Sequence, residues 1–309
     1  MPLVWQSAAL VVLLASTWLI VGASLHNAST GIVSAGRTGF TVVGLLALSW
    51  RSMFTTSTAT AEPPVPTPAP RYRWWQVVIL ALTGVTAYTM FSTVAISLAG
   101  PALPALAMSL TPAVVLLAEG LVARAWPPAR AITGTAIAVL GAVLYAIPRL
   151  AGTLGRDVAL GSLVAVAAML SMAFYGLYFA RTNRGHQGAM APRILPIFAV
   201  GTLPLAAWAS TELTAGDAGG WRTTGMLALL GIVIYVPAYL LQHRILLVGG
   251  PSYSALLGLA VPPLVGISSA MLHLAGAPVP AQIAGMALTL VGMAIVVRGK
   301  FAQAKKETS

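Results

Sequence analysis

Ten apolar stretches follow one another along this chain of 309 residues, separated mostly by short polar segments. A helix of about 20 apolar residues, rising about 1.5 Å per residue, crosses the ~30 Å hydrocarbon core of a bilayer. The strands of a membrane barrel would instead alternate apolar and polar residues. Because backbone groups in lipid must bond within their own segment, continuous apolar runs of this length predict spanning helices. The expected spans lie near residues 3–24, 31–50, 75–98, 101–123, 129–148, 158–180, 191–211, 224–247, 252–275 and 279–298.

Composition supports a membrane protein and excludes a water-soluble one. Hydrophobic residues make up 58% of the chain and charged residues only 7%, whereas about a quarter of a soluble domain is charged. The net charge of +11 is spread between the apolar stretches and is not gathered on one element, as nucleic-acid binding would require. The chain has 0 cysteines, which excludes disulfides and thiolate metal sites. We therefore predict an all-α integral membrane protein in contact with the lipid bilayer, without a nucleic-acid partner, metal or cofactor.

The positions of the basic residues predict the orientation of the spans. With the N-terminus inside, the inner segments hold 13 Lys and Arg residues and the outer segments hold 3, while Arg37 lies within a span. Cytoplasmic loops of membrane proteins carry the excess of basic residues. Both termini are therefore expected to be cytoplasmic, together with a Ser/Thr/Pro-rich loop at 51–73. The N-terminal sequence MPLVWQSAAL has no basic residue, so the first stretch is expected to be a retained span and not a cleaved signal peptide.

The two halves of the chain resemble each other at an offset of about half the length. The segment AGPALPALAMSLTP at 99–112 resembles GGPSYSALLGLAVP at 249–262. The prolines of the two segments have the same spacing: Pro101 and Pro112, Pro251 and Pro262. A second match pairs glycines of the fifth expected span with glycines of the tenth: Gly134 and Gly141, Gly285 and Gly292. Recurrence of this kind indicates an internal repeat.

Five expected spans in each half place the second copy upside down in the membrane, because five is an odd number. The predicted domains are a first five-helix repeat at 1–150, an inverted five-helix repeat at 151–298, and a basic cytoplasmic tail at 299–309. Inverted repeats are typical of secondary transporters, which bind substrate between the halves near the bilayer midplane.

In these features the chain resembles the drug/metabolite transporter superfamily, and in particular its ten-helix EamA branch. The resemblance covers essentially the whole chain. It rests on Arg37 early in the second span, the segment ending Ser109-Leu110-Thr111-Pro112, the Gly134…Gly141 helix, and weaker repeats of these features in the second half. Tyr88 and Tyr239 are similar to residues of the family's third and eighth spans.

This resemblance implies a secondary transporter of the bacterial inner membrane that exports small organic metabolites, such as amino acids or drugs, by alternating access of the two halves. It also implies that spans 1, 3, 4, 6, 8 and 9 line a central cavity and that spans 5 and 10 are peripheral. The resemblance does not imply enzymatic activity, and it is compatible with a homodimer. The chain departs from the family at Ala125 and Gly276, where an acidic residue is usual.

Polar and aromatic side chains inside the spans are the candidate substrate-binding groups, because such groups face protein or a water-filled cavity and not lipid. Glu119 is the only acidic residue inside an expected span. Its carboxylate either binds a proton or a cationic group, or it is partly solvated near the inner end. Tyrosines three or four residues apart share a helix face and either line a cavity or belong to the interfacial aromatic belt. The expected substrate-binding residues are Trp18, Tyr88, Ser109, Glu119, Tyr175, Tyr235, Tyr239 and Gln242.

A second group is expected to shape the helices or gate the cavity. Arg37 either holds a substrate carboxylate with its guanidinium fork or, in the favoured interpretation, snorkels to the outer interface or caps carbonyl groups. His243 and His273 lie at span ends, where a histidine is more often solvated than coupled to protons. Prolines bend helices, and small residues let two helices approach closely. The expected structural and gating residues are Arg37, Pro112, Pro262, Gly134, Gly141, Gly285 and Gly292.

A membrane-embedded enzyme and a flippase subunit for lipid-linked substrates are the alternatives. The sequence has no HExxH motif, no close pair of intramembrane acids and no Cys/His cluster, so the groups needed for hydrolysis are lacking. A channel usually needs a symmetric ring of ligands around its pore, which a two-fold inverted repeat does not supply. The predicted function is therefore secondary transport of a small-molecule substrate.

Overall fold

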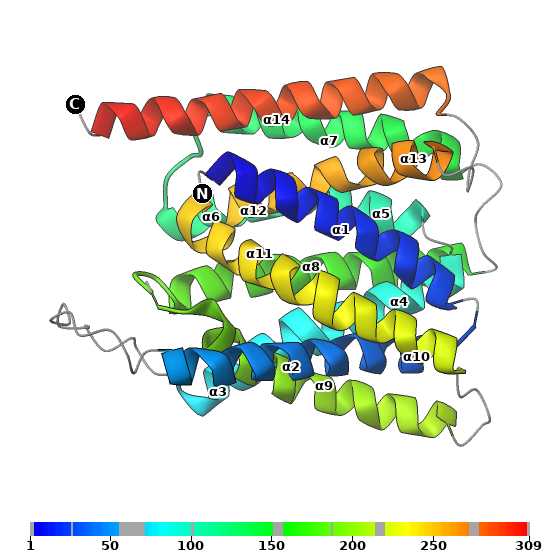
Figure 1. The fold of residues 1–309 in the computed structure, drawn as a ribbon. Helices are drawn as coiled ribbons and strands as arrows, with labels where there is room; N and C mark the ends of the chain where they lie inside the picture. The colour runs from blue at the N-terminus through cyan, green and yellow to red at the C-terminus, as the bar shows by residue number, and fades with distance from the viewer. Residues whose placement is uncertain are drawn as a thin grey trace, which may run out of the picture.

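The computed structural model describes residues 3–25, 27–55, 72–99, 102–150, 157–186, 188–213, 220–271 and 278–307. Within these ranges all regular secondary structure is helical, and nine helical segments are long and apolar enough to cross a membrane. The helices lie side by side along one common direction (Figure 1). The all-α prediction is confirmed, and the architecture is that of a multi-pass membrane protein.

Several of the expected spans correspond to single uninterrupted helices. They are α1 (Leu3–Leu25), α2 (Thr30–Thr55), α7 (Ala129–Leu150), α8 (Val158–Thr182), α9 (Met190–Leu213) and α14 (Pro280–Glu307). Helix α2 continues beyond the expected end of the second span, and most of the expected 51–73 loop lies outside the described residues. The start of α1 and the end of α14 lie at the same end of the bundle (Figure 1).

The third and eighth expected spans each contain one π-helical segment. The third consists of α3 (Trp74–Leu80), η1 (Ala81–Ala87) and α4 (Tyr88–Ala99), and the eighth of α10 (Trp221–Ala228), η2 (Leu229–Tyr235) and α11 (Val236–Gly249). In the eighth span the pattern of backbone hydrogen bonds must shift, because Pro237 has no N–H to donate to the preceding turn. The third span has no proline there, but Thr86 at its π-helix donates a hydrogen bond to the carbonyl of Gly201 on α9, at 2.8 Å.

The fourth and ninth expected spans are each broken into shorter helices. The fourth consists of α5 (Ala102–Ser109) and α6 (Thr111–Ala123), and the ninth of α12 (Pro251–Leu257), the 3₁₀ turn η3 (Gly258–Ala260) and α13 (Val261–Met271). Pro112 and Pro262 lie in the first turns of α6 and α13, where a proline is tolerated because its missing N–H has no partner there. The carbonyl of Pro262 accepts a hydrogen bond from the hydroxyl of Tyr145 on α7, at 2.8 Å.

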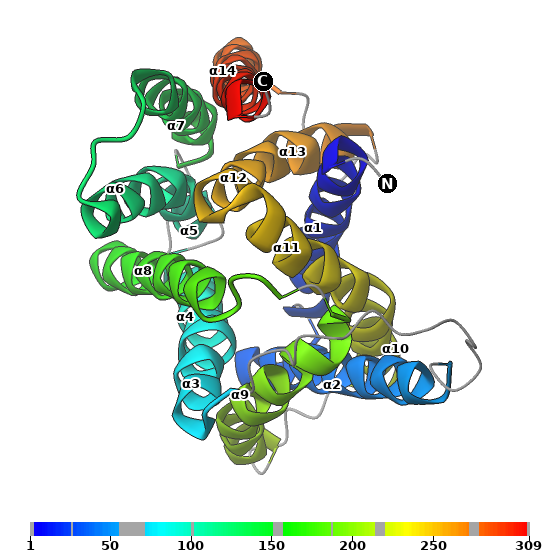
Figure 2. The ribbon, with the colours of Figure 1, turned by 90° about the vertical axis from the view of Figure 1, so that its left-hand side faces the viewer.

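Helices α7 and α14 pack against each other at one edge of the bundle (Figure 2). The contact joins backbone to backbone: a Cβ on Gly134 would lie 2.9 Å from the carbonyl oxygen of Gly292, and one on Gly141 would lie 2.7 Å from that of Gly285. Residue numbers increase along α7 where those of the contacting residues on α14 decrease, so the two helices are antiparallel. All four glycines that repeat in the sequence meet at this contact.

The remaining contacts recur in pairs between the first five spans and the last five. Helix α2 packs on η2 as α9 packs on η1, and α1 contacts α11 as α8 contacts α4. Helix α1 also contacts α13 as α8 contacts α6. Helices α2 and α9 lie together at the edge of the bundle opposite α7 and α14 (Figure 2).

Glu212, at the end of α9, caps the beginning of α2. Its Oε2 accepts hydrogen bonds from the Ser29 hydroxyl at 2.5 Å and from the Gly31 backbone N–H at 2.7 Å. The first N–H groups of a helix have no partner within the helix, and an acid there also interacts favourably with the helix dipole. The expected seventh span ended one residue before this carboxylate, so its role was not predicted.

Replacing Glu212 with alanine is expected to destabilise the protein by about 1 kcal/mol, the usual cost of losing a helix cap. The measurement is thermal unfolding of the purified protein in detergent. Asp157 provides a matched control, because it precedes α8 but makes no side-chain capping hydrogen bond. Asp157→Ala should therefore change the unfolding temperature less than Glu212→Ala, and equal shifts would show that the cap contributes nothing.

Candidate functional site

A row of aromatic rings follows one face of the eighth span. Tyr235, Tyr239 and His243 are four residues apart, a spacing that places them one above another on a helix. The rings of Tyr235 and Tyr239 are stacked, with centroids 5.1 Å apart and planes 12° apart. The ring of Phe198 on α9 packs against that of Tyr239, and the ring of Phe179 on α8 against that of His243. The ring centroids are 4.5 Å apart in both pairs. The structure therefore joins α8, α9 and α11 through a continuous aromatic cluster.

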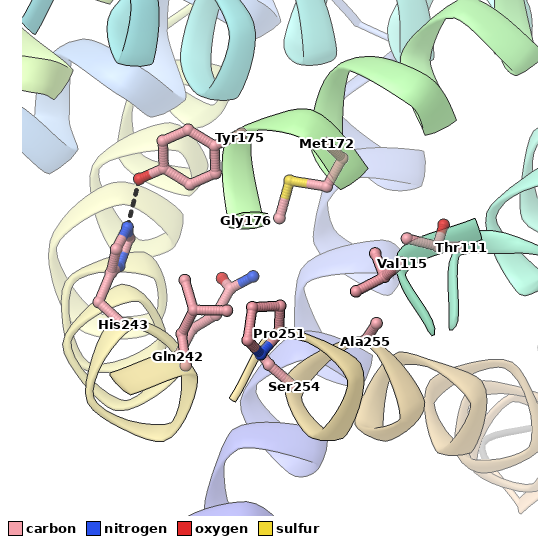
Figure 3. A pocket seen from close by; sticks show the side chains of 11 residues that line it. Thr111, Val115, Met172, Tyr175, Gly176, Gln242, His243, Pro251, Ser254 and Ala255 are labelled. Atoms are coloured by element: carbon pink, nitrogen blue, oxygen red, sulfur yellow. Dashed lines mark hydrogen bonds between the residues drawn. The ribbon is translucent and has the colours of Figure 1, made fainter. Parts of the chain in front are cut away.

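His243 is a buried member of this cluster and is only 1% exposed. Its Nδ1 lies 2.6 Å from the carbonyl oxygen of Tyr239, and its Nε2 is hydrogen-bonded to the hydroxyl of Tyr175 on α8 (Figure 3). A carbonyl oxygen can only accept, so Nδ1 carries the proton; in the neutral ring Nε2 then accepts from Tyr175. The expectation of a solvated histidine at the span end is wrong, because α8 packs over this part of α11.

Arg37 of α2 approaches the other end of the same row. Its Nη1 donates a hydrogen bond to the Tyr235 hydroxyl at 3.0 Å, and its guanidinium carbon lies 5.8 Å from the centre of the Tyr235 ring. Tyr88 and Tyr239 are also within electrostatic range of the guanidinium. The favoured interpretation was that Arg37 snorkels to the outer interface or caps carbonyl groups; the contact that the structure shows is with a phenol of the second half of the chain.

A cavity of about 60 Å³ lies beside the Tyr175–His243 pair. Its walls come from α6, α8, α11 and α12, and Gln242 and Met172 point into it (Figure 3). The hydroxyl of Thr111 lines it as well, and this buried oxygen has no hydrogen-bond partner in the described part of the chain. A volume of this size holds about two water molecules, so binding a metabolite here requires the surrounding helices to move apart.

Glu119 lies near the cavity on the face of α6 that carries Thr111 and Val115, two residues that line it. Its carboxylate accepts a hydrogen bond from the hydroxyl of Ser252, which lies in the first turn of α12. The contact therefore bridges the broken fourth span and the broken ninth span. Arg37 and Glu119 do not form an ion pair with each other, because each bonds a different residue of the second half.

The other expected site residues lie elsewhere. The hydroxyl of Ser109 bonds the carbonyl of Leu106 within its own helix at 2.6 Å, and Ser109 is absent from the cavity wall. Tyr178 is absent from the cavity wall, and its ring stacks on that of Phe174, with ring centroids 5.7 Å apart. The side chain of Trp18, together with His273 and Gly276, lies outside the described residues.

A polar cluster at the end of α8 was not predicted. Asn183 is fully buried, and its Oδ1 accepts hydrogen bonds from the Tyr72 hydroxyl at 2.8 Å and from Arg193 Nε at 2.5 Å. The guanidinium carbon of Arg193 also lies over the Tyr72 ring, 3.5 Å from the ring centroid. Burial raises the pKa of the Tyr72 phenol, against the opposing effect of Arg193, so the phenol keeps the proton that it donates. Asparagine is common in loops, so the sequence carried no signal for this cluster.

The Tyr175–His243 hydrogen bond yields a stability prediction. Tyr175→Phe leaves the buried Nε2 without its donor, which should destabilise the protein by about 1–3 kcal/mol. Tyr178→Phe is the matched control, because the Tyr178 hydroxyl has no partner among the described residues. Unfolding temperatures of both variants in detergent test this, and a Tyr175→Phe variant as stable as Tyr178→Phe would contradict the assignment.

No group of three or more His, Asp or Glu residues with the geometry of a metal site occurs in the described ranges. No protein-family model and no curated protein matches the sequence. Solved structures do match in fold. One of them, described only as "Crystal structure of protein", aligns with a TM-score of 0.68 over 95% of this chain and 96% of its own, with 18% sequence identity. At this identity the likeness concerns the fold alone.

Proposed function

We propose that this chain is a secondary transporter of the drug/metabolite transporter type. It has ten spans, including α1, in two inverted five-helix repeats, with both termini in the cytoplasm. It resides in the cell membrane and exports small organic metabolites, such as amino acids or drugs, by alternating access. No cofactor takes part, and the chain is not an enzyme.

Two partly buried polar contacts between the two halves carry this proposal. Arg37 of the first half bonds Tyr235 of the second half, and Glu119 of the first half bonds Ser252 of the second. Polar groups inside membrane spans are costly and usually mark a pathway for solutes or ions.

The paired contacts support the inverted repeat. Each half contains one π-helical span followed by one broken span, in the order α3–η1–α4 then α5–α6, and α10–η2–α11 then α12–η3–α13. Discontinuous helices at corresponding positions of two halves are the usual surroundings of a transporter's binding site. Rocking of the halves would open the cavity beside Tyr175 and His243 by separating α6 from α12.

Counterflow in proteoliposomes tests the proposal. Vesicles with purified protein are preloaded with one pooled metabolite at a time, and exchange of the labelled compound is followed with and without an imposed pH gradient. We expect saturable exchange of at least one compound, absent from protein-free vesicles. Folded protein that exchanges nothing across a wide panel of metabolites and toxic cations would overturn the proposal and favour a flippase subunit.

A further inference from the structure

Arg37 is a cation inside a membrane-spanning helix with no counterion among the residues that the structure describes. Its side-chain hydrogen bond goes to a phenol, and no carboxylate of the described residues lies within ion-pair distance. Charged groups at this depth almost always pair with an opposite charge or face a water-filled cavity. Its neighbours within electrostatic range are tyrosines: Tyr88, Tyr235 and Tyr239.

The surroundings of Arg37 are rich in hydrogen-bond donors and poor in acceptors. A guanidinium has five N–H donors, and only one of them, on Nη1, bonds a protein group in the described ranges. The oxygen of Tyr235 accepts that bond, so its own O–H proton is available for another acceptor. The hydroxyls of Tyr88 and Tyr239 likewise bond no described protein group, and both side chains are partly exposed. Such a set of donors is suited to an anion.

The geometry of the donors and rings defines the class of anion. A guanidinium binds a carboxylate through two parallel N–H···O bonds, which gives both strength and orientation. The Tyr235 ring lies beside it, Tyr239 stacks on Tyr235, and Phe198 packs on Tyr239, so apolar ring surface continues from the guanidinium along the eighth span. A ligand that matches both parts has one carboxylate and a flat or apolar body.

We propose that Arg37, with the hydroxyls of the surrounding tyrosines, binds the carboxylate of the transported solute, so that the protein selects organic monocarboxylates over their neutral and cationic analogues. This inference rests on the proposed transport function. It assigns Arg37 a binding role in place of the structural one.

Binding to the purified protein tests the inference without requiring transport. The probes are benzoate, phenylacetate and 3-phenylpropanoate, each compared with its amide and with the corresponding amine. Affinity is measured from the ligand-induced rise of the unfolding temperature, since a ligand that binds only the folded state stabilises it. We expect at least one acid to bind the wild-type protein at least about tenfold more tightly than its amide, because the amide leaves the guanidinium unpaired.

Three variants locate the binding group. Arg37→Gln removes the charge and should abolish the preference for the acid, whereas Arg37→Lys should retain part of it. Tyr235→Phe keeps the ring and removes one hydroxyl, so it tests the same site if Arg37→Gln does not fold. Arg244→Gln is the matched control, because Arg244 is exposed on the same helix as Tyr239, and it should bind the acid as the wild type does.

The outcomes separate this inference from the proposed function. An acid that binds through Arg37 but is not exchanged in counterflow would support the inference and count against transport. Two results would overturn the inference and leave transport standing, provided that solutes are exchanged in counterflow. One is equal affinity of the wild-type protein for the acid and its amide. The other is a preference for the acid that is retained in both Arg37→Gln and Tyr235→Phe. Absence of binding by every acid to the folded wild-type protein would also overturn it.

Discussion

Replacing Tyr239 with alanine is expected to slow solute exchange by about tenfold or more, whereas replacing Arg298 with alanine should leave it unchanged. Tyr239 contacts the rings of both Tyr235 and Phe198. Aromatic pairs contribute about 0.5–1.5 kcal/mol each, so losing two of them corresponds to roughly a ten- to hundredfold effect on an equilibrium. Arg298 is exposed on α14, far along the chain from the aromatic cluster. Initial rates of counterflow at matched protein density measure the difference.

Tyr239→Phe is the control for this prediction. It retains the ring and its stacking and loses only the hydroxyl, so it should be closer to the wild type than Tyr239→Ala. Because the alanine variant leaves space inside the bundle, its unfolding temperature must be measured together with its transport rate. Equal transport by Tyr239→Ala and Arg298→Ala, both folded, would exclude the aromatic cluster from the solute pathway.

Replacing Gly285 with leucine is expected to produce the largest loss of folded protein. A Cβ at this position would lie 2.5 Å from the backbone nitrogen of Tyr145 and 2.6 Å from the carbonyl oxygen of Gly141. These are backbone atoms, which cannot turn aside as the end of a flexible side chain can. Forcing extra atoms into a packed contact costs about 1–3 kcal/mol and sometimes more. Helices α7 and α14 would have to separate, so we expect an unfolding temperature lower by several degrees and a smaller yield of monodisperse protein.

Gly39 offers a matched control on another membrane-spanning helix. A Cβ on Gly39 would meet nothing within 4 Å, so Gly39→Leu should fold in nearly wild-type yield. Size-exclusion chromatography of the detergent-solubilised variants compares the two directly. If Gly285→Leu and Gly39→Leu behaved alike, the close approach of α7 and α14 would not exist in the folded protein.

The conformation described here has little space for a solute. The cavity beside Tyr175 and His243 is about 60 Å³, far below the several hundred Å³ of typical small-molecule sites. The Glu119–Ser252 contact joins two of the helices around it, α6 and α12. In the proposed mechanism these helices separate to admit the solute, and breaking that contact is part of opening.

The helical class and most of the spans could be read from the sequence. Hydrophobic length is a local property of the chain, and lipid leaves a helix as the only way for such a segment to satisfy its backbone. The effect of Pro112 and Pro262 is also local, because a proline disrupts its own helix wherever that helix lies in the fold. The sequence analysis therefore predicted bent helices at these prolines, but it did not predict the π-helical segment at Ala81–Ala87, which has no proline beside it.

The partners of the polar residues depended on packing between distant parts of the chain. Arg37 and Tyr235 are 198 positions apart, Glu119 and Ser252 are 133 apart, and Tyr175 and His243 are 68 apart. No local pattern specifies such pairs, since each follows from how helices distant in the sequence lie against one another. The sequence therefore supplied membrane-spanning helices and a short set of polar candidates, because both follow from local hydrophobicity. The tertiary structure alone decided that His243 is buried and that Arg37 meets tyrosines instead of a carboxylate, because these contacts exist only when helices distant in the sequence pack together.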